Sequence, residues 1–276
     1  MMHRLNIGGA VLTIVTVVAA AIWAFPLYWA VVTSLQTDND VIAPGVRLIP
    51  GSVTLSSYIH ALVHTSMGQW YINSIVTSVA ITVIVVFMAA CCGYAISQLR
   101  FPGRGPIYLL ILASFMVPIQ ALLVTHFVLM ADFGFVNTWA GVILPQLIAP
   151  VTVIIYKQFF DSVPKELREA AVVDGASEFH LLFKLYLPMN WGITVALAVI
   201  TYITAWNSFL WPLLVTTQER MMTITVGVIG VDDAFGVHYA RDLAVAVLAS
   251  LPVALLYLVF QRRVTQAIML SAGIKG

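Results

Sequence analysis

Long apolar stretches separated by shorter polar segments run through the chain, and this pattern predicts membrane-spanning helices. A hydrocarbon core of about 30 Å requires about 20 apolar residues in a helix. Each stretch is too long for a soluble strand, and none shows the two-residue alternation of a membrane barrel. We therefore expect an all-α integral membrane protein with six spans, at residues 7–35, 72–97, 107–130, 139–160, 193–216 and 243–260.

The first apolar stretch follows Arg4, as the core of a signal peptide follows a positive residue. It is longer than the 7–15 residues of such a core. The pattern therefore favours an uncleaved first span, with a cleaved signal peptide as the alternative.

The basic residues predict the orientation, because cytoplasmic loops carry an excess of Lys and Arg. If the N-terminus is inside, only Arg47, Arg220 and Arg241 of the 13 basic residues lie outside, which leaves ten inside. We therefore expect both termini in the cytoplasm. The long loops 36–71 and 217–242 then lie outside, and the long loop 161–188 lies inside.

The composition agrees with a membrane protein. Hydrophobic residues make up 61% of the 276 residues and charged residues only 9%, against about 25% charged in soluble domains. This excludes an ordinary soluble globule and a disordered chain. The net charge of +1 does not point to nucleic acid. We see no linker, repeat or soluble domain, and expect a single transmembrane domain over residues 1–276.

Enzyme and cofactor motifs are missing from the sequence. It has no G-x-x-x-x-G-K-[ST] motif for ATP, no G-x-G-x-x-G helix opening and no G-x-S-x-G elbow. Cys91 and Cys92 are adjacent in an apolar run, which favours plain packing residues. His60 and His64 have the spacing of a helical zinc pair, but no third ligand lies nearby, which favours a solvated pair. We expect no catalytic residue, no metal and no cofactor on this chain.

The expected spans carry no central charge, and this argues against a proton-coupled carrier or an ion pump. Neutral polar residues remain at depth. They could bind a polyhydroxy solute, or they could form interhelical hydrogen bonds worth about 0.6 kcal/mol each. These residues are Asn73, Ser74, Thr77, Gln120, His126, Gln146, Asn207 and Ser208.

The long inner loop, residues 161–188, is predicted to form a helix–turn–helix. Ser162 can cap a helix over 165–173, with Pro164 in its first turn, where the missing N–H costs nothing. Gly175 permits the positive φ that ends this helix. Its small Ala face allows close approach by another surface, although an amphipathic helix resting on headgroups is the alternative.

The second short helix of this loop is expected to begin at Ser177, which can cap it, and to run to about Tyr186. Pro188 is expected to end it. The loop therefore predicts two short helices on the cytoplasmic surface.

One long motif in this loop resembles a known family. Glu169-Ala170-Ala171 is followed after three residues by Gly175 and after nine more by Leu185-x-Leu187-Pro188. This resembles the EAA loop in permease subunits of binding-protein-dependent ABC importers, with Leu185 where the family usually has Ile. Asp174 also belongs to the matched stretch.

Further stretches resemble the carbohydrate-uptake subclass of that family. They cover nearly the whole chain and suggest a type I permease similar to the smaller maltose-importer permease. The stretches are Tyr71-Ile72-Asn73-Ser74, Arg100-Phe101-Pro102-Gly103-Arg104, Gly134–Thr138 with Ile143-Leu144-Pro145, Trp206-Asn207-x-Phe209-Leu210-Trp211-Pro212 and Ser271–Gly276.

The resemblance implies a multi-pass subunit of a bacterial-type cytoplasmic membrane that works with partners. An extracytoplasmic binding protein would deliver the solute, a second permease would complete the pathway as a heterodimer, and two ATP-binding subunits would dock on the inner loop. The tail 271–276 would also reach toward these ATPases. The coupling residues carried over are Glu169, Ala170, Ala171, Asp174, Gly175, Leu185 and Pro188.

The resemblance also implies a sugar or oligosaccharide as the solute, with a glycerophospho-compound as the alternative. Aromatic faces beside hydrogen-bonding groups suit sugars. We therefore name Gln120, Tyr202, Trp206, Asn207 and Trp211 as candidate pathway residues, although the tryptophans could instead be interface anchors. A secondary transporter, which would need a coupling-ion site, and a membrane scaffold or lipid-directed enzyme remain as other classes.

Overall fold

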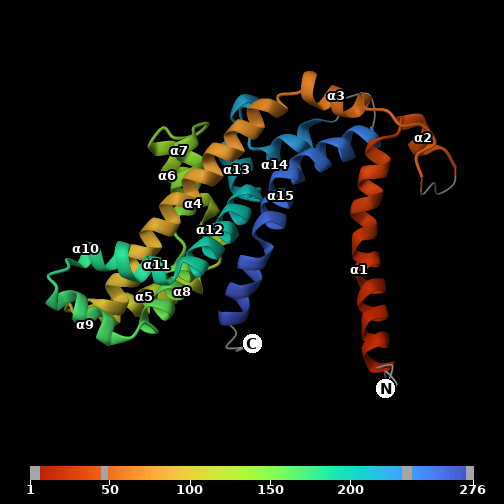
Figure 1. The fold of residues 1–276 in the computed structure, drawn as a ribbon. Helices are drawn as coiled ribbons and strands as arrows, with labels where there is room; N and C mark the ends of the chain where they lie inside the picture. Colours follow the sequence, from red (N-terminus) through yellow and green to blue (C-terminus); the bar gives the residue numbers. More distant parts are fainter. Residues whose placement is uncertain (1–6, 45–48, 232–237, 272–276) are drawn as a thin grey trace, which may run out of the picture. The chain divides into compact units, whose positions relative to one another are not determined.

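The computed structural model describes residues 7–44, 49–231 and 238–271, and within these ranges the chain forms helices joined by turns and loops, with no strand. They form two compact units, one from residues 1–68 and 227–251, the other from residues 69–226 and 252–276. Figure 1 shows the course of the helices within each part. The prediction of an all-α membrane protein is confirmed.

The first unit is built on α1, which is continuous over Ile7–Ser34, and on the beginning of α15. The side chains from 11 to 28 are exposed, as expected for a helix that faces lipid. Asp38 accepts a hydrogen bond from the backbone N–H of Ala240 at 3.1 Å, and its other oxygen lies 2.9 Å from His238 Nδ1. The elements of this unit are α1, α2 (Asp38–Ile42), α3 (Ser56–Val63) and the first part of α15 (Tyr239–Ser271).

The second unit is built around the long helix α4. Its core is aromatic: Tyr94, Tyr156, Phe160 and Tyr186 are all nearly inaccessible to solvent. Gly93 lets α4 and α8 approach closely, because a Cβ there would lie 2.7 Å from the Cβ of Tyr156.

The α-helices of this unit are α4 (Met67–Gln98), α5 (Arg104–Phe115), α6 (Leu123–Asp132), α7 (Trp139–Ile143), α8 (Pro150–Asp161), α9 (Lys165–Val173), α10 (Glu178–Leu181), α11 (Leu187–Met189), α12 (Trp191–Trp206), α13 (Leu210–Val215) and α14 (Ile224–Gly227). Its short 3₁₀ segments are Ile119–Leu122, Leu144–Leu147 and Glu219–Met221, and Leu182–Tyr186 is a π-helical turn; a further 3₁₀ segment, Val228–Val231, belongs to the first unit.

Three of the six expected spans are single long helices among the described residues: Val11–Ser34, Met67–Gln98 and Tyr239–Arg262. Up to six spans result if each strongly bent helix pair counts as one. The expected third span is bent by 93° between Phe115 and Ile119, because Pro118 lacks an N–H and adopts an extended conformation. The fourth is bent by 48° before Pro150.

The expected fifth span also differs from one continuous helix. Helix α12 ends at Trp206, and α13 begins only at Leu210. At its other end, α12 is bent by 84° from the segment Glu178–Met189. The breaks after Phe115, Leu147 and Trp206 fall inside expected spans, whereas the bend after Met189 lies between the expected inner loop 161–188 and the expected fifth span.

The observed inner loop has most of the local structure that the sequence predicted. Helix α9 covers Lys165–Val173, Gly175 has a φ of +82°, and Ser177 Oγ accepts a hydrogen bond from His180 N–H at 3.3 Å. Two details of the prediction were wrong and concern Ser162 and Pro188.

Ser162 does not cap α9. It ends α8, where its hydroxyl donates to the carbonyl oxygen of Phe159 at 2.7 Å, and Pro164 occupies the cap position. The second helix passes Tyr186 and ends at Met189 rather than before Pro188. The π-helical turn that precedes Pro188 changes the hydrogen-bond register there, so that the missing N–H is tolerated.

Candidate functional site

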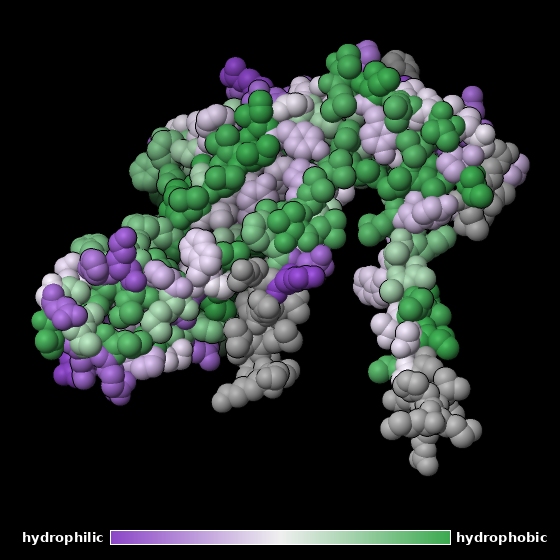
Figure 2. Space-filling view, in the orientation of Figure 1, coloured by the Kyte–Doolittle hydropathy of each residue, from purple (hydrophilic) through white to green (hydrophobic). Residues whose placement is uncertain are grey.

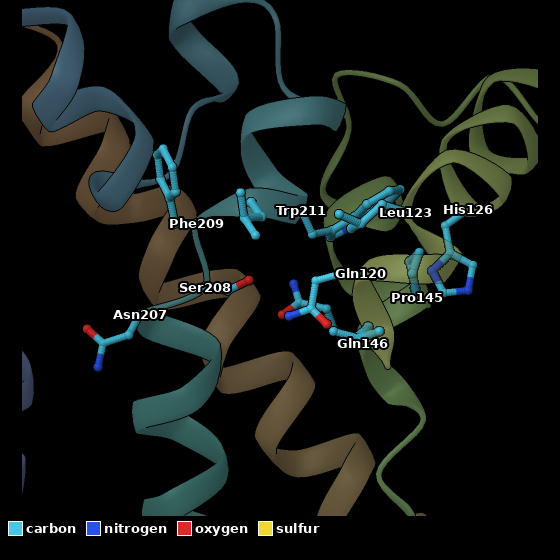
Figure 3. Close-up of a pocket in the computed structure, with 11 residues that line it drawn as sticks. Gln120, Leu123, His126, Pro145, Gln146, Asn207, Ser208, Phe209 and Trp211 are labelled. Carbon is cyan, nitrogen blue, oxygen red and sulfur yellow. The ribbon is translucent and has the colours of Figure 1, made fainter. Parts of the chain in front are cut away.

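A cavity of about 310 Å³ lies where three broken segments of the second unit meet (Figure 3). We call it the amide pocket. It is formed by the segment after Pro118, by the 3₁₀ turn Leu144–Leu147 and by the break between α12 and α13. Its lining residues are Ile119, Gln120, Leu123, His126, Pro145, Gln146, Asn207, Ser208, Phe209, Leu210 and Trp211.

The breaks themselves position the polar side chains. Pro118 ends the helical path of the third segment, so that Gln120 lies in a 3₁₀ turn beside the cavity. Asn207 is the C-cap of α12, and the backbone leaves the helical conformation at Phe209. Interrupted helices at membrane depth are tolerated where they line a cavity, because their free backbone groups find partners there.

Most of the pocket lining is apolar, and its polar side chains include no Lys, Arg, Asp or Glu. In Figure 3 the side chains of Gln120 and Gln146 overlap, the Ser208 hydroxyl is directed toward the same region, and the Asn207 amide is directed away from it. Gln146 Nε2 donates to the carbonyl oxygen of Val142 at 2.9 Å, which leaves its oxygen as an acceptor. The pocket therefore offers hydrogen bonds to a neutral polar solute.

Trp211 supplies the fixed aromatic face of the pocket. It is 5% exposed, and its Nε1 donates to the carbonyl oxygen of Gly141 at 3.0 Å. The ring of His126 stands edge-on to it, with centroids 6.0 Å apart. A buried hydrogen bond and a packed ring together hold the indole in one orientation.

Of the candidate pathway residues, Gln120, Asn207 and Trp211 line the amide pocket, whereas Tyr202 and Trp206 do not. The rings of Tyr202 and Trp206 stack at 5.9 Å, and Trp206 is 2% exposed. Sequence reasoning had noted Gln146, His126 and Ser208 only as polar residues at depth. It missed Phe209, because an apolar residue in a helix break carries no signal of its own.

Asn73 lies at the centre of a second polar cluster and is fully buried. Its Nδ2 donates to the carbonyl oxygens of Arg220 and Met222, both at 2.9 Å, and its Oδ1 accepts from Trp139 Nε1 at 2.9 Å. Ser74 Oγ accepts from the N–H of Ile224 at 2.7 Å. These two residues therefore bind the segment 219–224 to α4.

The predicted coupling residues of the inner loop differ in how far they are exposed. Glu169, Ala170, Asp174 and Pro188 are exposed. Ala171 and Leu185 are half-buried against the aromatic core, and the seventh residue, Gly175, has no side chain. Figure 2 shows hydrophilic residues gathered over α9 and α10. Of the tail 271–276, only Ser271 lies within the described residues.

The inner end of the second unit is held by polar contacts from α4. Ser97 Oγ donates to Asp161 Oδ1 at 2.6 Å, and Lys157 pairs with the other oxygen at 2.6 Å. The Gln98 carboxamide donates to the carbonyl oxygen of Phe160 at 3.1 Å and accepts from the Tyr186 hydroxyl at 2.7 Å. These contacts fix the position from which the inner loop begins.

No group of three His, Cys, Asp or Glu residues that could hold a metal ion occurs in the described part of the chain. The rings of His60 and His64 stack at 4.9 Å with an interplanar angle of 12°.

Comparison with known proteins matches residues 86–269 to the family described as binding-protein-dependent transport system inner membrane component. The fold is similar to a chain in the crystal structure of a bacterial ABC transporter involved in the import of the acidic polysaccharide alginate. The TM-score is 0.83 with 21% identity, over 95% of this chain and 98% of that one.

Three curated relatives match over most of their length. The permease protein AraQ of an arabinooligosaccharides transport system from Halalkalibacterium halodurans is 32% identical, over 96% of both chains. The sn-glycerol-3-phosphate transport system permease protein UgpE from Agrobacterium fabrum is 30% identical, over 95% of this chain and 96% of that protein. The diacetylchitobiose uptake system permease protein NgcG from Streptomyces coelicolor is 29% identical, over 88% and 82%.

Proposed function

Because this chain belongs to the family of binding-protein-dependent transport system inner membrane components, we propose that its amide pocket forms part of the path of a neutral carbohydrate. The chain is a permease subunit of an ATP-driven ABC importer, and it is a transport component rather than an enzyme. Its apolar helices make it a membrane protein.

The chemistry of the pocket lining carries this proposal. The carboxamides of Gln120 and Gln146 and the hydroxyl of Ser208 can exchange hydrogen bonds with sugar hydroxyls, and Trp211 offers an aromatic face for C–H patches. The lining contains no Lys, Arg, Asp or Glu. A neutral solute therefore meets partners for its polar groups and leaves no charge buried.

A glycerophosphate is the alternative solute, since one relative is named for sn-glycerol 3-phosphate. A phosphate is usually bound by Arg, Lys or backbone N–H groups. The pocket lining contains no Arg or Lys side chain. The pocket thus favours the sugars, as in the relatives named for arabinooligosaccharides and diacetylchitobiose.

The inner loop is proposed as the docking element for the ATP-binding subunits. Glu169 and Asp174 are exposed acceptors on α9 and its C-cap, and Ala170 beside them is small enough for close contact. A second permease, in a heterodimer, would complete the pathway, and an extracytoplasmic binding protein would deliver the solute. Both termini are proposed to be cytoplasmic, with the tail 271–276 near the ATPases.

Uptake by the reconstituted complex tests the pocket. We would compare radiolabelled arabinotriose, diacetylchitobiose and sn-glycerol 3-phosphate in proteoliposomes that hold both permeases and the ATPases, with the binding protein added. Gln120→Ala and Gln146→Ala should each lower sugar uptake about tenfold, the effect of losing about 1.4 kcal/mol of hydrogen bonding. Basal ATP hydrolysis should not change.

Gln158→Ala is the matched control, because Gln158 is an exposed residue of α8 outside the pocket. Normal uptake by both pocket variants would reject the pathway. Preference for sn-glycerol 3-phosphate over both sugars would reject the neutral carbohydrate and leave the permease assignment intact.

A further inference from the structure

Glu178 joins two helices of the inner loop to a membrane span. Its Oε1 accepts a hydrogen bond from Arg168 Nη2 at 2.7 Å, and its Oε2 accepts from the Tyr94 hydroxyl at 2.5 Å. Arg168 lies on α9, Glu178 is the first residue of α10, and Tyr94 lies near the C-terminal end of α4. One carboxylate therefore links three elements.

The ring of Tyr94 is held rigidly at its end of this link. It is 4% exposed and packs edge-to-face against Tyr186 at 5.1 Å and Phe160 at 6.2 Å. Because the ring is fixed by packing, the direction of its hydroxyl is fixed by α4. Glu178 can follow this hydroxyl only if α10 keeps its position relative to α4.

The ion pair alone would not make a firm link. The side chains of Arg168 and Glu178 are 27% and 46% exposed, and exposed pairs contribute little. The Tyr94 hydroxyl makes the link firmer, because it donates a hydrogen bond to the second oxygen of the Glu178 carboxylate from the buried side. With both oxygens engaged by different elements, the carboxylate cannot turn without losing a charge-assisted hydrogen bond.

We propose that Tyr94, Arg168 and Glu178 form a clamp that makes α9 and α10 move with α4 as one body when the ATP-binding subunits close. The proposal rests on the proposed function, because the inner loop receives a force only if ATPases dock there. All three are positioning residues, since none is placed in the amide pocket.

The other polar contacts at this end of α4 reach different elements. Ser97 and Gln98 bond to Asp161 and Phe160 at the end of α8, and Tyr186 joins Gln98 to the π-helical turn. The clamp adds side-chain hydrogen bonds to the packing of Ala171, which also holds α9 against the aromatic core. Without the clamp, this apolar packing would have to hold α9 in place, and α9 could shift more easily about the turn at Gly175.

The clamp is testable in the assembled importer by electron–electron distance measurement. Spin labels at Lys165→Cys on α9 and Met88→Cys on α4, with Cys91 and Cys92 replaced by Ala, report the separation of the two helices. Both labelled positions are exposed. Distances are measured without nucleotide and with ATP and vanadate, in the presence of the binding protein.

In the wild-type background the distance distribution should be the same in both states. Glu178→Gln removes the charge, and Tyr94→Phe removes the hydroxyl but keeps the ring. Each should raise the population with a changed α9–α4 distance about fivefold in the ATP–vanadate state, the lower end of usual coupling strengths. Tyr108→Phe is the matched control, because it keeps the ring over which Lys157 lies at 4.9 Å.

An exchanged pair, Arg168→Glu with Glu178→Arg, separates the two halves of the clamp. It is made in the Tyr94→Phe background, because an arginine at 178 could otherwise donate to the oxygen of the Tyr94 hydroxyl. The exchange then restores the pairing of α9 with α10 without any hydrogen bond to α4, and the distance should stay heterogeneous. A uniform distance in the exchanged variant, or wild-type distributions in Glu178→Gln and Tyr94→Phe, would overturn the clamp.

The proposed function fails in a different way. If the ATP-binding subunits do not copurify with the wild-type chain, the docking role of the inner loop is wrong. If they copurify with every variant and all distributions coincide, only the clamp is wrong. A variant that is merely less stable would no longer copurify with the ATP-binding subunits, but its α9–α4 distance distribution would keep a single maximum.

Discussion

At the scale of single residues, Asn73 makes a sharp prediction about stability. Its carboxamide bonds to Trp139, Arg220 and Met222 inside the protein. Asn73 itself is fully buried, and Asn73→Ala removes all three hydrogen bonds, so we expect it to lower the free energy of unfolding by about 2 kcal/mol. Unfolding in detergent, followed by tryptophan fluorescence, measures this. Asn39→Ala, at an exposed position of α2, is the matched control, and equal midpoints for the two variants would contradict the prediction.

Gly175 makes a second prediction at this scale. Its φ is +82°, and a Cβ there would meet nothing within 4 Å, so that any penalty comes from the backbone alone. A branched residue in this conformation costs about 1–3 kcal/mol. We expect Gly175→Val to weaken copurification of the ATP-binding subunits and their stimulated ATP hydrolysis, and Gly175→Asn to do so less.

Gly105 provides the control for Gly175. It also has open space around a Cβ, but it lies inside α5 with a negative φ. Gly105→Val should leave both measurements unchanged. If Gly175→Val kept wild-type assembly and stimulated hydrolysis, the turn would have no part in coupling.

At the scale of elements, the sequence predicted what is built from local rules and failed where geometry depends on neighbours. The bounds of α9 and the positive φ of Gly175 follow from helix-forming residues and a single glycine. A proline can kink a helix, but the 93° bend beside Pro118 depends on which groups bond to the freed backbone groups. Hydropathy could not show the break, because the residues around Pro118 remain apolar.

The same limit explains which pathway candidates reached the amide pocket. Tyr202 and Trp206 share a helix face by their spacing, and they do stack on each other. Helix α12 ends at Trp206, so that Ser208 and Trp211 follow a different path from the one that a continuous helix would give. Residue types were thus predictable, whereas their grouping around the pocket required the positions of three breaks.

At the scale of the whole molecule, the chain combines a proposed docking loop with a lack of nucleotide motifs. The family assignment, first indicated by the EAA motif, is confirmed by the match over residues 86–269. The energy for transport must then come from other subunits. The chain has to receive their movement at one site and change the path of the solute at another. The proposed clamp and the amide pocket are both in the second unit, which gives this unit both tasks.

The orientation of the chain in the membrane is the last prediction. The ten-to-three distribution of Lys and Arg places the loop 161–188 inside and the loops 36–71 and 217–242 outside. Single cysteines at Asn39, Gln218 and Asp174, all exposed positions, are introduced after Cys91 and Cys92 are replaced by Ala. A membrane-impermeant maleimide should label Asn39→Cys and Gln218→Cys in spheroplasts, and Asp174→Cys only after the membrane is opened. Because ATP is cytoplasmic, labelling of Asp174→Cys from outside would reject both the topology and the docking of ATP-binding subunits on the inner loop.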